Sequence, residues 1–173
     1  MNITTAQINE QFARMKPYRV AFAHAAKVYD IPVELLYAIA SRETNCQNII
    51  GDGGHGHGIM QIDDRSYPDF CHSGAWHDID AAIMKGAEVF DSKRKQVTAL
   101  VGHASRVSGV SFVGASLSSA DLLRVATAAY NCGLWAYYNF SHGQDVDRNS
   151  TGKDYSKDVW QRKAVFAALL KGN

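Results

Sequence analysis

The sequence is poor in the features that mark disulfide-stapled, membrane-spanning or nucleic-acid-binding proteins. It has three cysteines, Cys46, Cys71 and Cys132. A count that is small and odd does not indicate a disulfide framework. We expect buried thiols, with one bridge plus one free thiol as the alternative. No apolar run approaches the roughly 18 residues that span a membrane. The formal net charge is +1, so the protein lacks the strong positive electrostatic field that would favour binding to nucleic acid.

The N-terminus lacks the pattern of a secretory signal, since MNITTAQINEQFARMKPYRV has no basic start followed by an apolar stretch. We expect the chain to be synthesised in the cytoplasm without a signal peptide, unless a signal was trimmed before this numbering begins. What is present is an ordinary globular composition, with 46% hydrophobic and 20% charged residues. The 173 residues suffice for one domain with a core, and we expect a monomer.

Apolar residues at helical spacing dominate the chain. The pattern predicts helices over residues 8–15, 17–29, 32–43, 78–90, 118–133 and 155–170. Asp78 and Ser118 suit helix N-caps, and Pro32 suits a first helical turn, where its missing N–H is harmless.

Two segments lack the helical pattern. Residues 51–58, GDGGHGHG, predict a flexible loop, and the following IMQID run predicts a short strand. Residues 102–119 are rich in Gly, Ser and Val and predict a long surface loop or flap of the kind that often serves a binding site. We therefore expect a mainly α single domain over residues 1–173, with a small irregular or β region around 51–75.

Glu43 is the carboxylate in the most unusual position. It shares one helix face with three apolar residues, Leu36, Ile39 and Ala40. Burial on that face raises the pKa of a carboxyl group, and the C-terminal end of a helix disfavours negative charge. A protonated carboxyl is what a general acid for a glycosidic oxygen requires. The structural alternative is a glutamate paired with a buried arginine such as Arg162.

Two aspartates follow this helix. Asp52 lies in the glycine-rich loop, and Asp63 directly follows Met60-Gln61-Ile62. Glycines allow the backbone to approach a ligand closely. An acid on a helix facing loop carboxylates is the arrangement that glycoside hydrolysis needs. Asp52 could instead have a structural role as a turn residue, because Gly-Asp-Gly is a common turn composition.

Four segments in this order resemble goose-type lysozymes and the related soluble lytic transglycosylases. They are SRE at 41–43, GD at 51–52, GIMQID at 58–63 and AYNCG at 129–133, with a weaker fifth, DYSKDV, at 154–159. The resemblance covers about residues 30–65 and 125–162. It departs from the family at Cys132, where a small residue is usual, and at 102–119, which looks like an insertion.

The resemblance implies a lysozyme-like α-fold and cleavage of the peptidoglycan strand between N-acetylmuramic acid and N-acetylglucosamine. It implies that Glu43 protonates the bridging oxygen and that Asp52 and Asp63 position or activate water. By the same match, the cleft is lined by Gln61, Tyr130, Asn131 and Tyr155. The two tyrosines have core packing as an alternative, because both lie on apolar faces. His57, in the glycine-rich loop, is expected to line the cleft or face solvent.

The chemical outcome of the cut divides this family. A lytic transglycosylase uses one glutamate and yields anhydromuramic products, whereas an inverting hydrolase needs a second carboxylate that activates water. Because Asp52 and Asp63 both match, we favour inverting hydrolysis, with transglycosylation as the alternative. No cofactor and no metal are expected. The lack of a signal and of a wall-binding module favours a phage-type endolysin that acts on the bacterial wall after release.

Other enzyme classes are weaker interpretations. A zinc amidase would bind its metal through His55 and His57 with Asp52 or His72, but zinc ligands need a rigid scaffold and these lie among glycines. A cysteine peptidase acting on wall peptides would use Cys71 beside His72. A non-catalytic glycan-binding module would not need an acid beside two aspartates.

Overall fold

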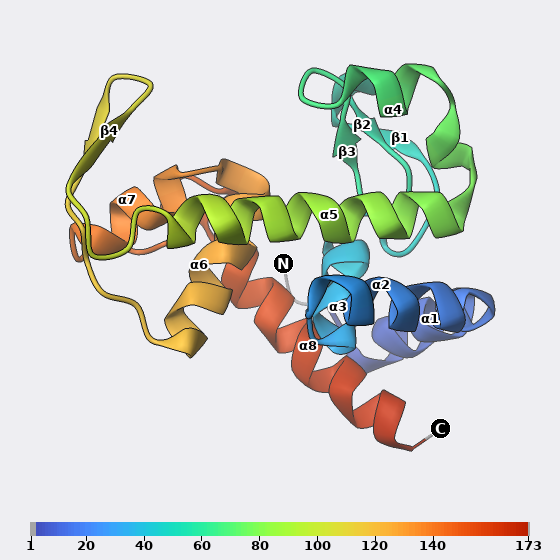
Figure 1. Cartoon of the computed structure of the whole chain (residues 1–173). Coiled ribbons are helices and arrows are strands. Elements are labelled where there is room, and N and C mark those ends of the chain that lie inside the picture. Colours follow the sequence, from blue (N-terminus) through green and yellow to red (C-terminus); the bar gives the residue numbers. More distant parts are fainter. Residues whose placement is uncertain (1–2, 173) are drawn as a thin grey trace. The chain divides into compact units, whose positions relative to one another are not determined.

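The computed structural model describes residues 3–172 and is mainly α (Figure 1). The α-helices are α1 Thr5–Met15, α2 Arg19–Tyr29, α3 Val33–Thr44, α4 Pro68–His72, α5 Ile79–Thr98, α6 Ser119–Cys132, α7 Trp135–Ser141 and α8 Tyr155–Lys171. One sheet contains β1 Ile50–Gly51, β2 Gly56–His57 and β3 Ile62–Asp63, and a second contains β4 Ser105–Val107 and β5 Val110–Phe112. The expectation of a mainly α fold with a small β region is confirmed.

The described residues form two compact units. The first contains residues 3–88 and 158–172, and the second contains residues 89–157, so α5 and α8 each contribute to both. The glutamate and aspartates expected to act in catalysis all lie in the first unit.

Local sequence explains several helix ends of the first unit, although α5 extends to Thr98, beyond the predicted residue 90, and α4 was not predicted. Thr4 caps α1 in a reciprocal capping box with Gln7. Pro32 directly precedes α3, and Asn45 ends that helix in the left-handed conformation that Asn tolerates (φ 52°). Asp78 accepts hydrogen bonds from the backbone N–H groups of Asp80 and Ala81 at 2.9 and 3.3 Å, as an N-cap of α5 does.

An aromatic cluster joins α1, α2, α3 and α8 within the first unit. Tyr37 of α3 stacks on Phe22 of α2 with 4.2 Å between ring centroids, and it lies 5.7 Å from Phe166 of α8. Phe12 of α1 contacts both Tyr37 and Phe166. Helix α3 is consequently surrounded by other elements along most of its length.

The glycine-rich segment is folded, and the prediction of a flexible loop over 51–58 is wrong. Gly56 pairs with Gly51 on one side and with Asp63 on the other, so three short antiparallel strands form one sheet. A turn of 3-10 helix, Asp52–Gly54, connects β1 to β2. The strand expected within IMQID is present as β3.

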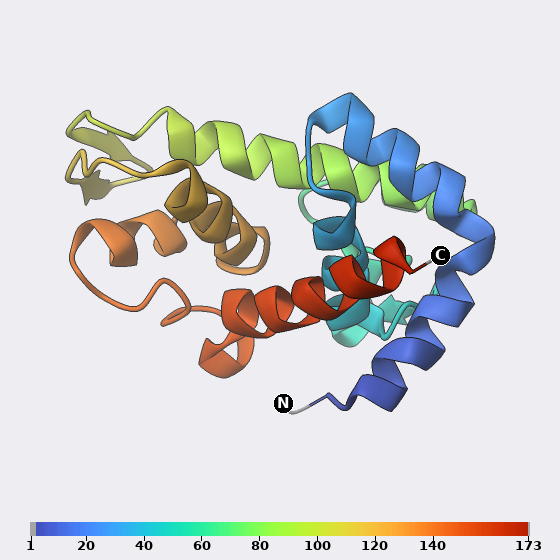
Figure 2. The same ribbon diagram turned by 90° about the horizontal axis from the view of Figure 1, so that it is seen from below.

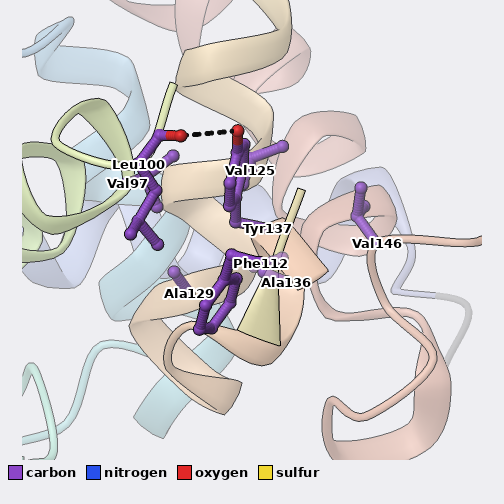
Figure 3. Close-up of a cluster of buried hydrophobic side chains, with 9 residues drawn as sticks. Val97, Leu100, Phe112, Val125, Ala129, Ala136, Tyr137 and Val146 are labelled. Carbon is purple, nitrogen blue, oxygen red and sulfur yellow. Dashed lines mark hydrogen bonds between the residues drawn. The ribbon is translucent and has the colours of Figure 1, made fainter. Parts of the chain in front are cut away.

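The second unit also contains structure where a loop was expected. Within 102–119, β4 and β5 form a hairpin that follows the C-terminal end of α5 (Figures 1 and 2). Behind it lies a core of apolar side chains that includes Phe112 and Tyr137 (Figure 3). The Tyr137 hydroxyl lies 3.0 Å from the Leu100 carbonyl and 2.9 Å from the Ala115 carbonyl, which ties together the two ends of the hairpin segment.

The three cysteines are free thiols. Cys46 and Cys71 are buried and Cys132 is half-buried, so the expectation of buried thiols holds and the alternative of a bridge is wrong. Within residues 3–172, none of the helices has both the length and the apolar character needed to cross a membrane.

Gly86 of α5 leaves the space that Met60 fills. A Cβ atom at position 86 would lie 2.5 Å from Met60 Cγ, and Met60 is fully buried. Alanine gains about 1 kcal/mol over glycine in a helix, but overpacking costs about 1–3 kcal/mol. We expect Gly86→Ala to lower the free energy of unfolding, measured by urea denaturation.

A matched double variant isolates this contact. In a Met60→Ala background the contacts with Cγ and Cε are absent and only that with Cβ, at 2.6 Å, remains, so Gly86→Ala should there destabilise less than in the wild type. Destabilisation of equal size in both backgrounds would show that Met60 is not the cause.

Candidate active site

Glu43 lies in the last turn of α3. Leu36, Ile39 and Ala40 are fully buried as expected, and so are residues on the other faces of the helix, including Leu35 and Ala38. Glu43 itself is half-buried. The side chain therefore lies at the point where a largely buried helix reaches the surface.

The residue two positions before Glu43 is held by a buried polar network. Ser41 is fully buried, and its hydroxyl donates to Gln11 Oε1 of α1. Arg162 of α8 donates through Nη1 to the Ser41 hydroxyl at 2.8 Å and to the Ser41 carbonyl at 3.1 Å. Gln11 also donates to the side chain of Asn45, just beyond the helix end.

A shared carboxylate holds the residue immediately before Glu43. Asp158 Oδ2 accepts from Arg42 Nη1 at 2.8 Å and from Arg162 Nε at 2.8 Å. Asp158 is 3% exposed, so both ion pairs are largely shielded from solvent. A purely structural role for Glu43 would pair it with a buried arginine such as Arg162. Arg162 binds Asp158 and Ser41.

The residue after Glu43 joins α3 to the small sheet. The Thr44 hydroxyl lies 3.0 Å from the carbonyl of Ile59, in the turn between β2 and β3. Asn48 accepts from the Ile59 N–H at 2.9 Å and donates to the Trp76 carbonyl at 3.2 Å. These bonds fix the turn of the sheet to the chain that leaves α3.

The side chain of Gln61 packs against the glycine-rich segment and forms hydrogen bonds with backbone carbonyls beside it. Its Nε2 donates to the carbonyls of Ile49 and Gly58 at 3.1 and 3.0 Å. Its Oε1 would lie 2.2 Å from a Cβ at position 51 and 2.3 Å from one at position 56. A side chain at either position would therefore have to displace the amide of Gln61. The expected contact of Gln61 with substrate stays a prediction.

Asp52 and Asp63 meet at one arginine that the sequence analysis did not single out. Arg65 Nη2 donates to Asp52 Oδ2 at 3.0 Å, and Arg65 Nε donates to Asp63 Oδ1 at 2.7 Å. Asp52 is in a left-handed conformation (φ 48°) at the start of the 3-10 turn. The structure thus brings the two expected water-binding carboxylates together, and the Asp-Asp-Arg sequence at 63–65 was the available signal.

Asp63 is held as a carboxylate. Partial burial acts to raise its pKa, but hydrogen bonds from Ser66 and Arg65, together with the Arg65 charge, outweigh burial and lower the pKa below its usual value. Ser66 Oγ donates to Asp63 Oδ2 at 2.7 Å. The group is therefore ionised at neutral pH.

His57 and His55 both reach Asp64. His55 Nδ1 lies 2.9 Å from Asp64 Oδ1, and His57 Nε2 lies 3.4 Å from Asp64 Oδ2. The hydrogen bond from His55, followed by that from His57, lowers the pKa of Asp64 despite some desolvation. His57 is half-buried with its ring edge against Trp76. Among residues 3–172, no group of three or more His, Cys, Asp and Glu side chains is arranged to hold a metal ion.

The thiol chemistry required by a cysteine peptidase finds no support. Burial raises the pKa of Cys46 to about 12 and that of Cys132 to about 11. Burial, with the Asp64 and Asp63 charges, also raises the pKa of Cys71. A nucleophilic cysteine needs a lowered pKa.

The remaining expected substrate residues belong to the second unit. Asn131 is exposed, and its Oδ1 accepts from the Thr151 N–H at 2.8 Å. Tyr130 is half-buried. Tyr155 is 1% exposed, which agrees with the core-packing alternative for its ring. Their contacts with substrate stay predictions.

Comparison with known proteins identifies the family. A family model described as Lysozyme g matches residues 5–168. The chain belongs to the lysozyme g family. Curated relatives named lysozyme g include a Cyprinus carpio protein that is 26% identical over 158 residues, which are 89% of this chain and 75% of the relative. A Takifugu rubripes lysozyme g is 28% identical over 164 residues, 91% of this chain and 77% of the relative.

Membership in the lysozyme g family makes the chain a glycoside hydrolase of the lysozyme type that acts on peptidoglycan. The goose-type resemblance inferred from four short segments is thereby confirmed. The catalytic residues and the stereochemical course are separate questions.

The buried charge network before Glu43 provides a stability test. Asp158→Asn keeps the side-chain volume but removes the negative charge shared by two largely buried guanidinium groups. We expect the free energy of unfolding to fall by about 3–5 kcal/mol, measured by urea denaturation at pH 7.

Asp145→Asn is the matched control. Asp145 is 45% exposed and pairs with Lys157 at the surface, so its loss should cost less than about 1 kcal/mol. Similar small effects of the two substitutions would contradict a stabilising role for the network.

Proposed function

We propose that this lysozyme g family member hydrolyses the β-1,4 bond between N-acetylmuramic acid and N-acetylglucosamine, with Glu43 as the general acid. The observation that carries the proposal is the position of Glu43. It is half-buried at the surface end of a buried helix, between residues held on both sides by Arg162, Asp158 and Ile59. A carboxyl held in this way can be placed against one substrate oxygen.

The first step is protonation of the bridging oxygen by the Glu43 carboxyl. Glu43 lies at the C-terminal end of α3, where the helix dipole disfavours a negative charge. The bond between the sugar C1 and the bridging oxygen breaks as the proton arrives, and the positive charge develops on the ring.

The second component is a water held by Asp63 and Asp52. The water oxygen bonds to C1 on the ring face opposite the leaving group, and the proton it loses passes to Asp63, which gives inversion. The lowered pKa of Asp63 supports this role because a water-binding carboxylate must be ionised. The pairing with Arg65 reduces basicity, so orientation of the water is the larger contribution.

Substrate contacts follow from the resemblance. Gln61 and His57 of the first unit, and Tyr130, Asn131 and Tyr155 of the second, are the proposed glycan-binding residues. We further propose that the 173 residues act as one catalytic domain and as a monomer.

Glu43→Gln tests the acid. The amide keeps the size of the side chain but has no proton acidic enough to transfer to the leaving oxygen. We expect turnover of purified peptidoglycan to fall by at least about 100-fold, measured by release of reducing ends. Glu88→Gln, at an exposed position of α5, is the control and should keep wild-type turnover. A Glu43→Gln enzyme of near wild-type rate would remove Glu43 from the mechanism.

Asp63→Asn and Asp52→Asn test the water. Each amide is a weaker acceptor for water, so turnover should fall in both variants and fall further in the double variant. Mass spectrometry of the wild-type products should show reducing-end muramic acid. Anhydromuramic products, with turnover insensitive to both substitutions, would instead support lytic transglycosylation.

A further inference from the structure

Arg65 connects two carboxylates that are distant in the chain. Asp63 is in β3, and Asp52 begins the 3-10 turn between β1 and β2. One guanidinium donates to both, through Nε to Asp63 and through Nη2 to Asp52. The sheet register brings their backbones to neighbouring positions, since Gly56 pairs with Asp63 on one side and with Gly51, the residue before Asp52, on the other.

The guanidinium imposes a fixed geometry on this pair. Its N–H groups lie in one plane at fixed separations, so carboxylate oxygens bound to two of them are held at a set spacing. A lysine ammonium has no such planar fork, because its three N–H groups rotate about a single point.

We infer that Arg65 is a positioning residue that sets the spacing and orientation of Asp52 and Asp63 for the attacking water. The inference rests on the proposed function and adds to it a residue that does not itself touch the reacting atoms.

Structural stabilisation alone does not account for the arrangement. The Arg65 side chain is 60% exposed and that of Asp52 is 67% exposed, and ion pairs this exposed contribute little to stability. The sheet is also held by its backbone pairing and by hydrogen bonds from the side chains of Gln61 and Thr44. Removal of Arg65 should therefore leave the fold intact.

The contacts of Asp63 leave room for water. Oδ1 accepts from Arg65 and Oδ2 accepts from Ser66. A carboxylate oxygen has two lone pairs, so each oxygen retains one that can accept from a water. Arg65 and Ser66 thus fix the orientation of the Asp63 carboxylate, and each carboxylate oxygen can still accept a hydrogen bond from water.

Removal of Arg65 also has a predictable effect on titration. The charged and titratable groups that act on Asp63 or respond to it are Arg65, Asp64, Tyr67 and Cys71. Of these, Arg65 is the cation. Without it, burial and the Asp64 charge raise the pKa of Asp63, so the acid limb of activity moves to higher pH.

The experiment compares Arg65→Met, Arg65→Lys and wild type on soluble peptidoglycan fragments across pH. We expect Arg65→Met to lower kcat about 10- to 100-fold with KM within about twofold, and to move the acid limb of kcat/KM upward. A ¹³C titration of the Asp63 carboxyl should show the same upward shift. Arg65→Lys should keep the acid limb near that of wild type but still lose kcat, because charge is retained and the fork is lost.

Arg106→Met is the matched control, since Arg106 is an exposed arginine of β4 that binds the Gly109 carbonyl. It should change neither kcat nor the pH profile. Wild-type kcat and an unmoved acid limb in Arg65→Met, with turnover reduced in Glu43→Gln and Asp63→Asn, would overturn the role of Arg65 alone. Full kcat in Arg65→Lys would overturn the fork geometry. Near wild-type turnover in Glu43→Gln or Asp63→Asn would instead overturn the proposed function.

Discussion

The position of the proposed acid depends on one buried carboxylate oxygen, Oδ2 of Asp158. It accepts from Arg42, which immediately precedes Glu43, and from Arg162, which in turn holds Ser41. Water cannot replace these partners in a buried site, so any helix arrangement that separates α3 from this part of α8 leaves charges without compensation. The end of α3 that carries Glu43 is therefore held by residues more than a hundred positions later in the chain.

The glycine-rich segment shows the same principle in a smaller volume. Glycines in a sequence suggest mobility, but Gly51 and Gly56 lie against the amide of Gln61, which a side chain at either position would displace. The amide adds a second hydrogen bond to the carbonyls of Ile49 and Gly58, each of which also accepts from a backbone N–H. The segment is therefore held by backbone pairing and by a neighbouring side chain together.

Much of the fold could be predicted from sequence, because helices and caps depend on residues close together in the chain. Asp78 and Ser118 cap helices as expected, and Pro32 precedes α3. The hairpin within 102–119 could not be predicted in this way, since Tyr137 fastens it from a distant helix. The burial of α3 on several faces, where the sequence predicted one, likewise depends on contacts with residues distant in the chain, on α1, α2 and α8.

Sequence motifs suggest the members of the proposed site but not the contacts between them. Glu43, Asp52 and Asp63 could be named from short motifs, but the bond from Arg65 to Asp52 depends on the fold of the intervening turn. A motif match also does not distinguish a cleft residue from a core residue, so the substrate contact of Tyr155, whose side chain is buried, stays a prediction.

The two charge networks of the first unit differ in what burial lets them do. Around Asp158 the charges are shielded, so each partner is essential to the stability of the others. Around Arg65 the charges are exposed, so the bonds add little stability but still restrict where two carboxylates lie. Glu43 follows directly from the first network, and the aspartates belong to the second. Thr44 and Asn48 connect the end of α3 to the sheet that carries the aspartates. The same kinds of side chain thus stabilise the fold where they are buried and restrict the positions of two carboxylates where they are exposed.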